Sequence, residues 1–263
     1  MKPRLLFILL LLSGCSNIMY ESLPTEGNGQ YYFEHPGQPA VLVIHGLTAT
    51  PWEVIGLSVY LTEHNFTVLT PVLEGHGRRP VDLEAATWQD WYENVNDSYT
   101  RLAAKDVPVF VIGVSTGGSL ALELAKEHEL AGVITVGAPV TLFDQRTKYV
   151  SWLSPIWRYT ARVVLQDEVG HYYPVWPSKS VGELVALIDA SIASASTITE
   201  SVLIIQSKDD RTVQPVSAQQ LSDVLINAPK EIFWVNGKNH VVIREDTEGV
   251  VFTKIIGFLN EHS

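Results

Sequence analysis

A glycine-flanked serine at the end of an apolar run is the feature that most restricts how this chain can fold. Residues 109–112 are apolar and mostly β-branched, which is typical of a buried strand. The run ends in Gly113-Val114-Ser115-Thr116-Gly117, and residues 120–126 then have a helical pattern. A serine on so tight a strand-to-helix turn needs glycine two residues to either side, because Cβ atoms there would collide. The pattern predicts that Ser115 lies at a helix N-terminus, where free N–H groups favour negative charge.

The pentapeptide G-x-S-x-G is a weak signal by itself, because the chain holds 18 glycines and such a pattern can arise by chance. The strand–turn–helix context favours an exposed nucleophilic serine over an incidental turn. Ser115 is therefore the first candidate catalytic residue, and the remaining sequence has to supply its partners.

The composition describes a folded protein, with 46% hydrophobic and 18% charged residues over a length of 263. This length fits one large α/β domain or two small ones. The formal net charge of −11 argues against nucleic acid as a partner. The eight histidines are scattered and no CxxC or HExxH motif occurs, so the sequence predicts no metal site.

The N-terminus has the pattern of a secretory signal. Lys2 and Arg4 precede an apolar run over residues 5–12, which is shorter than the about 20 residues that span a bilayer. Leu12-Ser13-Gly14-Cys15 then resembles the lipobox of bacterial lipoproteins, and Cys15 is the single cysteine of the chain. The alternatives are an ordinary signal peptide with an incidental cysteine, or a short uncleaved anchor.

The lipobox resemblance implies that residues 1–14 are removed and that Cys15 carries the lipid that holds the protein to a membrane. Such a protein is located in the bacterial cell envelope. If the host has an outer membrane, the residue after the cysteine, Ser16, favours that membrane, on its periplasmic or surface face. Residues 15–30 are mostly polar and contain Pro24, Gly27 and Gly29, which predicts a flexible tether before a domain over residues 31–263.

Strand and helix patterns alternate through that domain. Strands are expected at 31–33, 40–44, 66–70, 109–112, 130–139, 201–206 and 231–235, and helices at 51–63, from 88, at 120–126, 180–191 and 245–259. In the helix at 180–191, Ser180 and Glu183 have the spacing of an N-terminal capping box. Strands that alternate with helices predict an α/β fold with a mostly parallel sheet.

Several motifs resemble those of α/β-hydrolases, and in particular the bacterial carboxylesterase and monoacylglycerol lipase branch. His45-Gly46-Leu47-Thr48 follows the strand at 40–44, and a Gly75-His76-Gly77 turn precedes a helix with tryptophans at 88 and 91. The resemblance implies that the backbone N–H groups of Leu47 and Thr116 form an oxyanion hole. We interpret His45 and His76 as residues that brace loops and not as the catalytic base.

The same resemblance supplies an acid and a base. Residues 209–215 fit a D-x-x-V-x-P pattern when Asp210 is the acid, whereas Asp209 is one residue out of register. The alternative for either aspartate is a helix N-cap or a surface charge. His240 lies between the last strand and the last helix, where the family has its base. The order Ser115, Asp210, His240, after the fifth, seventh and eighth strands of the fold, is that of a hydrolase triad.

Residues 140–199, after the sixth strand of the fold, interrupt the alternation and resemble a small helical cap. The insertion is rich in aromatic residues, namely Tyr149, Trp152, Trp157, Tyr159, Tyr172, Tyr173 and Trp176. These side chains either line an acyl pocket or pack the cap against the body, and the sequence does not favour one over the other.

The resemblance as a whole implies a serine esterase or lipase without metal or organic cofactor. The expected substrates are short- to medium-chain acyl esters or monoacylglycerols, cleaved through an acyl-enzyme on Ser115. Thioesterases, lysophospholipases and cofactor-free haloperoxidases use the same triad and remain alternatives. A further alternative, of another class, is an inactive lipid-anchored binding or envelope protein on a hydrolase scaffold.

Overall fold

The computed structural model describes residues 28–150, 154–193, 195–244, 246 and 249–263. The signal peptide predicted at 1–14, the predicted lipidation site Cys15 and most of the predicted tether lie outside the described residues, as does Trp152. In the part of the chain that is described, no helix is both long enough and apolar enough to cross a membrane.

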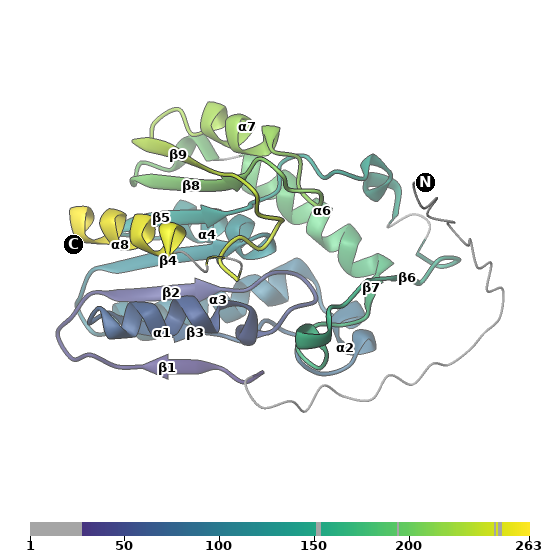
Figure 1. Ribbon diagram of the computed structural model, residues 1–263, viewed down its shortest axis with the longest axis horizontal. Helices are drawn as coiled ribbons and strands as arrows, with labels where there is room; N and C mark the ends of the chain where they lie inside the picture. The colour runs from purple at the N-terminus through teal and green to yellow at the C-terminus, as the bar shows by residue number, and fades with distance from the viewer. Residues whose placement is uncertain (1–27, 151–153, 194, 245, 247–248) are drawn as a thin grey trace, which may run out of the picture.

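A seven-stranded sheet forms the centre of the molecule, with the order β1-β3-β2-β4-β5-β8-β9. Its strands are β1 (Tyr31–Phe33), β2 (Ala40–Ile44), β3 (Thr67–Thr70), β4 (Val109–Val114), β5 (Gly132–Val136), β8 (Val202–Ser207) and β9 (Lys230–Val235). Only β1 runs antiparallel to its neighbour, β3, and all other neighbours pair in parallel. The predicted α/β fold with a mostly parallel sheet is therefore confirmed (Figure 1).

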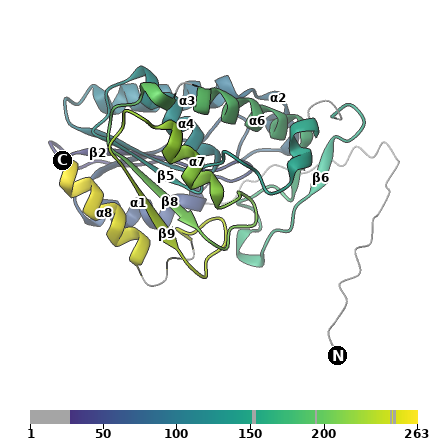
Figure 2. The ribbon, with the colours of Figure 1, turned by 90° about the horizontal axis from the view of Figure 1, so that it is seen from above.

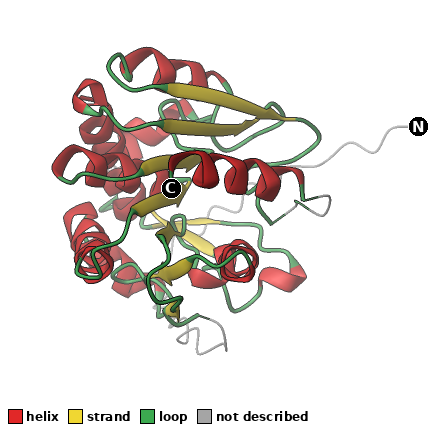
Figure 3. Cartoon of the chain, turned by 90° about the vertical axis from the view of Figure 1, so that its left-hand side faces the viewer, coloured by secondary structure: helices red, strands yellow, loops and turns green. Residues whose placement is uncertain are grey.

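Helices cover both faces of this sheet. They are α1 (Ile55–Glu63), α2 (Pro80–Ala85), α3 (Trp88–Ala103), α4 (Thr116–Glu127), α6 (Ser178–Ala193), α7 (Val216–Val224) and α8 (Val250–His262), with short 3-10 turns η1 (Pro51–Val54), η2 (Gln145–Tyr149), η3 (Gln166–Glu168) and η4 (Ala195–Thr197). Seen from above, α3, α4, α6 and α7 lie on one side of the strands and α1 and α8 on the other (Figure 2). The end-on view shows the same three layers (Figure 3).

Alternate residues of each central strand enter the two separate cores between these layers. In β2, Leu42 and Ile44 pack with the helices on the α3 and α4 side, whereas Val41 and Val43 pack with α1 and α8. All four side chains are fully buried. A strand that is covered on both faces has no solvent side, which explains why these runs are continuously apolar instead of alternating.

Several elements differ from the sequence-based expectation. In the described residues only one strand, β1, precedes β2. Ser115, Asp210 and His240 therefore follow the fourth, sixth and seventh strands of the sheet and not the fifth, seventh and eighth, and the insertion follows the fifth strand and not the sixth. The helices α2 and α7 were not predicted. The last helix begins at Val250 and not at 245, because Gly249 has a φ of +69° and interrupts the helical backbone.

The insertion at 140–199 combines one long helix with irregular structure. A two-stranded antiparallel sheet, β6 (Tyr159–Ala161) with β7 (Val175–Pro177), lies beyond the carboxyl ends of the parallel strands (Figure 1). The predicted helix at 180–191 is present as α6, but it packs against α4 of the body. The other described parts of the insertion are less helical than expected, and prolines within them remove backbone donors that a helix needs.

The capping box predicted for α6 is wrong. The helix begins at Ser178, two residues before Ser180. The hydroxyl of Ser180 donates to the carbonyl of Leu83 (3.1 Å), and the carboxylate of Glu183 accepts the backbone N–H of Trp88 (3.2 Å). Ser180 and Glu183 therefore join α6 to α2 and α3, and neither side chain caps the N-terminus of α6.

Candidate active site

Ser115 lies at the sharp turn between β4 and α4. Its backbone has a φ of 52° and a ψ of −118°, a conformation that L-residues rarely adopt. The N–H of Ser115 donates to the carbonyl of Val136 (2.8 Å), and its own carbonyl accepts from Gly118 (2.8 Å). These bonds to β5 and to the first turn of α4 hold the strained backbone, which costs about 1–3 kcal/mol.

The two flanking glycines are required for different reasons. A Cβ on Gly113 would lie 2.0 Å from the carbonyl oxygen of Gly117, which is the collision across the turn that the sequence predicts. A Cβ on Gly117 would instead lie 2.4 Å from the carbonyl oxygen of Ile44 in β2. The second glycine therefore lets α4 approach the neighbouring strand, and it brings the turn after β2 alongside Ser115.

The structure brings Ser115, His240 and Asp210 together from three separate loops. Nε2 of His240 lies 2.9 Å from Oγ of Ser115, and Nδ1 lies 2.7 Å from Oδ2 of Asp210. The two ring nitrogens thus face the serine and the carboxylate at hydrogen-bond distance. Asp209, the alternative acid, accepts the N–H of Gly237 (2.7 Å) at the surface.

Asp210 is buried and well supplied with donors. Its Oδ1 accepts the backbone N–H groups of Thr212 (2.8 Å) and Val213 (2.9 Å), and its Oδ2 accepts from the amide of Gln206 (3.1 Å). Burial raises the pKa of Asp210, but the hydrogen bond and charge of His240 and the two backbone donors outweigh it, so the net pKa is lowered. The carboxylate therefore stays ionised and fixed in orientation.

The two expected oxyanion donors belong to segments that meet at Ser115, the start of α4 and the loop after β2. Thr116 is the first residue of α4, where the N–H has no acceptor within the helix. Leu47 follows Gly46, whose Cα lies so close to Ser115 that an added Cβ would be 3.4 Å from the serine Cβ. Both N–H groups therefore belong to backbone segments next to Ser115.

His45 and His76 occupy the bracing positions that the sequence suggested. Nδ1 of His45 lies 2.9 Å from the carbonyl of Gly46, and Nε2 accepts the N–H of Leu73 (3.2 Å), which ties the loop after β2 to the loop after β3. The His76 ring meets the His45 ring edge to face at 5.0 Å. Burial lowers the pKa of His45 to about 4, so this imidazole is neutral at pH 7.

Sequence reasoning missed a buried carboxylate next to this site. Glu53 is 4% exposed, and its Oε2 accepts the N–H of Gly46 (2.6 Å) while its Oε1 accepts the hydroxyl of Tyr172 (2.8 Å). Burial raises the pKa of Glu53, opposed by these donors and by the charges of Arg162 and His240. The available signal was an isolated acid within the apolar residues 51–57.

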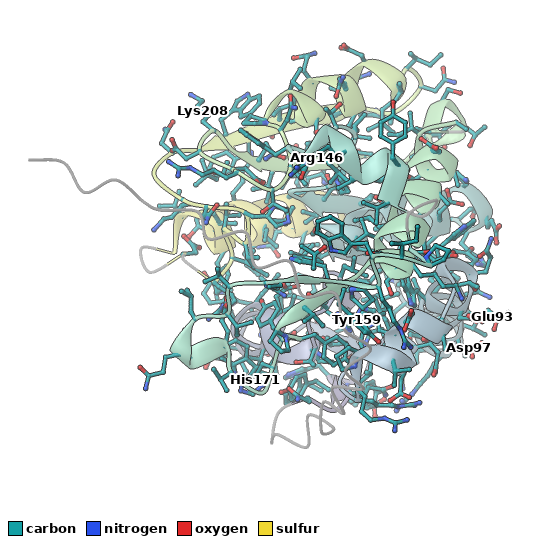
Figure 4. The ribbon with its side chains drawn as sticks, turned by 90° about the vertical axis from the view of Figure 1, so that its right-hand side faces the viewer. Glu93, Asp97, Arg146, Tyr159, His171 and Lys208 are labelled. Atoms are coloured by element: carbon teal, nitrogen blue, oxygen red, sulfur yellow. The ribbon has the colours of Figure 1, made fainter. Side chains whose placement is uncertain are left out.

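The aromatic residues of the insertion divide between two environments. Tyr172 and Tyr173 are buried against the body, and the hydroxyl of Tyr173 donates to the carbonyl of Gly75 (2.7 Å). Tyr149 and Trp157 are 58% and 60% exposed. Figure 4 views the molecule from the side of the insertion, with Tyr159 near the centre of that face. Tyr172 and Tyr173 thus pack the insertion against the body, which is one of the two roles that the sequence left open for these aromatic residues.

The described residues contain no group of three or more His, Cys, Asp or Glu side chains placed to hold a metal ion.

Comparison with known proteins gives relatives along almost the whole chain. A thermostable monoacylglycerol lipase of Bacillus sp. (strain H-257) is 26% identical over 250 residues, which cover 93% of this chain and 100% of the lipase. A carboxylesterase of Bacillus subtilis (strain 168) is 24% identical over 233 residues, 86% of this chain and 94% of the esterase. The solved structure of a metagenome-derived lipolytic enzyme superposes with a TM-score of 0.84 at 22% identity, over 90% of this chain and 99% of that one.

The family model described as "Alpha/beta hydrolase family" matches residues 41–251, which include the strand before His45 and all three residues joined at Ser115. With that match over most of its length, the chain belongs to the alpha/beta hydrolase family.

Proposed function

We propose that this protein is a serine hydrolase that cleaves carboxylic esters, of the carboxylesterase and monoacylglycerol lipase type. The observation that carries the proposal is His240, whose two ring nitrogens lie 2.9 Å from the Ser115 hydroxyl and 2.7 Å from the Asp210 carboxylate. A relative named as a monoacylglycerol lipase and another named as a carboxylesterase support the choice of ester bonds.

The proposed reaction begins with attack of Oγ of Ser115 on the ester carbonyl. His240 takes the hydroxyl proton at Nε2 as the oxygen–carbon bond forms, and Asp210 stabilises the resulting imidazolium and its orientation. The carbonyl electrons move to an oxyanion, which accepts the N–H groups of Leu47 and Thr116. In comparable sites one such donor lowers the activation barrier by about 2.7–4 kcal/mol.

Collapse of this intermediate breaks the ester bond. His240 returns its proton to the leaving alcohol, and the acyl group stays on Ser115. His240 then takes a proton from water, which attacks the acyl-enzyme, and the carboxylic acid leaves as Ser115 recovers its proton. All proton transfers use one imidazole, so the cycle closes without a cofactor.

Hydrolysis of p-nitrophenyl esters from C2 to C16 by a form that begins at Ser16 tests this proposal. We expect turnover that is absent from Ser115→Ala, and the preferred chain length measures the depth of the acyl site. A matched series of acyl thioesters and lysophospholipids separates the alternatives that share the triad. Absence of turnover together with absence of labelling by a fluorophosphonate would support the inactive scaffold instead.

We also propose that the protein is a lipoprotein, anchored to a membrane of the bacterial cell envelope through Cys15. The support is the sequence Leu12-Ser13-Gly14-Cys15 after a basic and then apolar leader. An ester hydrolase held in this way would work next to lipid, which agrees with substrates that are acyl esters or lipids.

A further inference from the structure

Glu53 is a buried carboxylate that the hydrolytic reaction does not use. It lies in η1, seven residues after Gly46, and it is bonded on both of its oxygens, to the Gly46 N–H and to the Tyr172 hydroxyl. A buried carboxyl group costs free energy unless its oxygen atoms are hydrogen-bonded. One of its two partners belongs to the loop after β2 and the other belongs to the insertion, so Glu53 connects these two segments.

A second set of bonds reaches the same loop two residues later. Thr48 has a φ of +64°, which is rare for a β-branched residue. Its carbonyl accepts the N–H of Tyr173 (3.0 Å), and its hydroxyl accepts from the guanidinium of Arg162. Both donors are in the insertion, so the insertion holds Thr48 in this strained conformation.

Arg162 is itself fixed by aromatic rings of the insertion. Its guanidinium carbon lies 4.2 Å from the ring centre of Tyr172 and 4.9 Å from that of Trp176. The Tyr172 side chain thus bonds Glu53 through its hydroxyl and stacks on Arg162 through its ring. Tyr172 thereby links the bond at Gly46 to the bond at Thr48.

Leu47 lies between these two attachment points. Glu53 fixes the residue before it, and Arg162 with Tyr173 fixes the residue after it. The Glu53 carboxylate is also close to the reacting group, because a Cβ on Gly46 would lie 3.2 Å from its Oε2 and 3.4 Å from Cβ of Ser115. Gly46 therefore fits closely between Glu53 and Ser115, with no room for a side chain larger than its hydrogen.

We propose that Glu53 is a positioning residue that, together with Tyr172, aims the N–H of Leu47 at the oxyanion, so that the docked insertion completes the oxyanion hole. This inference rests on the proposed function, in which that N–H is a catalytic donor. The physical reason is preorganisation: a donor that is already aligned needs no reorganisation as charge develops in the transition state. An aligned donor acts on the transition state more than on the bound substrate, so its loss lowers kcat more than it raises KM.

The test compares Glu53→Gln, Glu53→Leu and Tyr172→Phe with the wild type. A glutamine can still accept the Gly46 N–H and donate to Tyr172, so we expect Glu53→Gln to stay within about threefold of the wild-type kcat. Glu53→Leu loses both bonds, and we expect kcat to fall about tenfold or more with little change in KM. Tyr172→Phe removes only the bond to the insertion and should fall between the two.

Affinity for a trifluoromethyl ketone, which forms a tetrahedral oxyanion on Ser115, separates positioning from general destabilisation. We expect this affinity to fall by the same factor as kcat/KM in Glu53→Leu and Tyr172→Phe. Glu123→Gln is the matched control, because Glu123 is also a buried glutamate but bonds Lys126 within α4 (2.6 Å). The control should keep both quantities even if it lowers the melting temperature.

The outcomes separate the two proposals. If the wild type hydrolyses esters and Tyr172→Phe and Glu53→Leu keep wild-type kcat and ketone affinity, Glu53 has no positioning role. The same holds if Glu53→Leu does not fold and Tyr172→Phe alone keeps both quantities. If the wild type neither hydrolyses esters nor reacts with a fluorophosphonate, the proposed function fails and the role of Glu53 in it fails with it.

Discussion

The orientation of Asp210 relative to His240 is set by backbone donors and not by the histidine. Oδ1 of Asp210 accepts two backbone N–H groups, so only Oδ2 is left to face Nδ1 of His240 at 2.7 Å. The carboxylate therefore favours a proton on Nδ1, which in the proposed reaction leaves Nε2 free to take the proton of Ser115.

Asp210→Asn should invert that tautomer with almost no change in shape. The asparagine oxygen has to remain at the backbone donors, so its NH₂ group faces the imidazole and favours a proton on Nε2. We expect kcat to fall about 10³-fold or more while the protein stays folded. Ester hydrolysis and circular dichroism measure the two quantities, and a loss below tenfold would contradict this role for Asp210.

The glycines of the turn allow a sharp stability test. In Gly113→Ala the new Cβ would lie 2.0 Å from a backbone oxygen, so the turn must move. We expect the free energy of unfolding to fall by about 3 kcal/mol or more. Gly257→Ala in α8 is the control, since nothing lies within 4 Å of its Cβ, and alanine should raise the stability by up to about 1 kcal/mol. Urea unfolding of both variants gives the comparison.

The residues that could be predicted from the sequence are those whose constraints are local. The tight turn around Ser115 needs its glycines wherever it occurs. Asp210 and Asp209 are distinguished by their position after β8, because only Asp210 has the spacing of the D-x-x-V-x-P pattern. Continuous apolar runs also predicted the central strands, because a strand that is buried on both faces has no polar side.

The residues that were missed or misread depend on distant contacts. Ser180 and Glu183 have a local capping pattern, but their side chains bond instead to backbone groups 97 and 95 residues away in the sequence. Glu53 is bonded to a tyrosine 119 residues later. No spacing within either segment reveals such a bond, because the fold creates it when the insertion docks.

Buried neutral histidines predict a loss of stability in mild acid. The pKa of His45 is about 4 in the folded protein, against 6.5 for the free side chain. Between these values the unfolded chain binds a proton that the folded protein does not, so stability rises with pH over this window and falls on acidification. The full effect is about 3 kcal/mol, and the lowered pKa of His76 acts in the same direction.

His45→Gln should flatten this pH dependence, although the loss of its bonds lowers stability at pH 7. The measurement is the free energy of unfolding in urea at several values from pH 4.5 to pH 7.5, for the variant and the wild type. His64→Gln is the control, because that ring is exposed at the end of α1. Parallel curves for His45→Gln and the wild type would mean that His45 is not the group that titrates on unfolding.

The proposed lipid anchor makes a prediction that is independent of the catalytic site. Cys15→Ser removes the only thiol of the chain, so no thioether to a diacylglycerol can form. Two or more acyl chains are needed for stable membrane attachment. We therefore expect the variant to leave the membrane fraction and to lose incorporation of labelled palmitate, while ester hydrolysis per molecule is unchanged. If the variant lacks palmitate but stays in the membrane, the leader over residues 1–14 is an uncut anchor. If the wild type also lacks palmitate, Cys15 is an incidental cysteine.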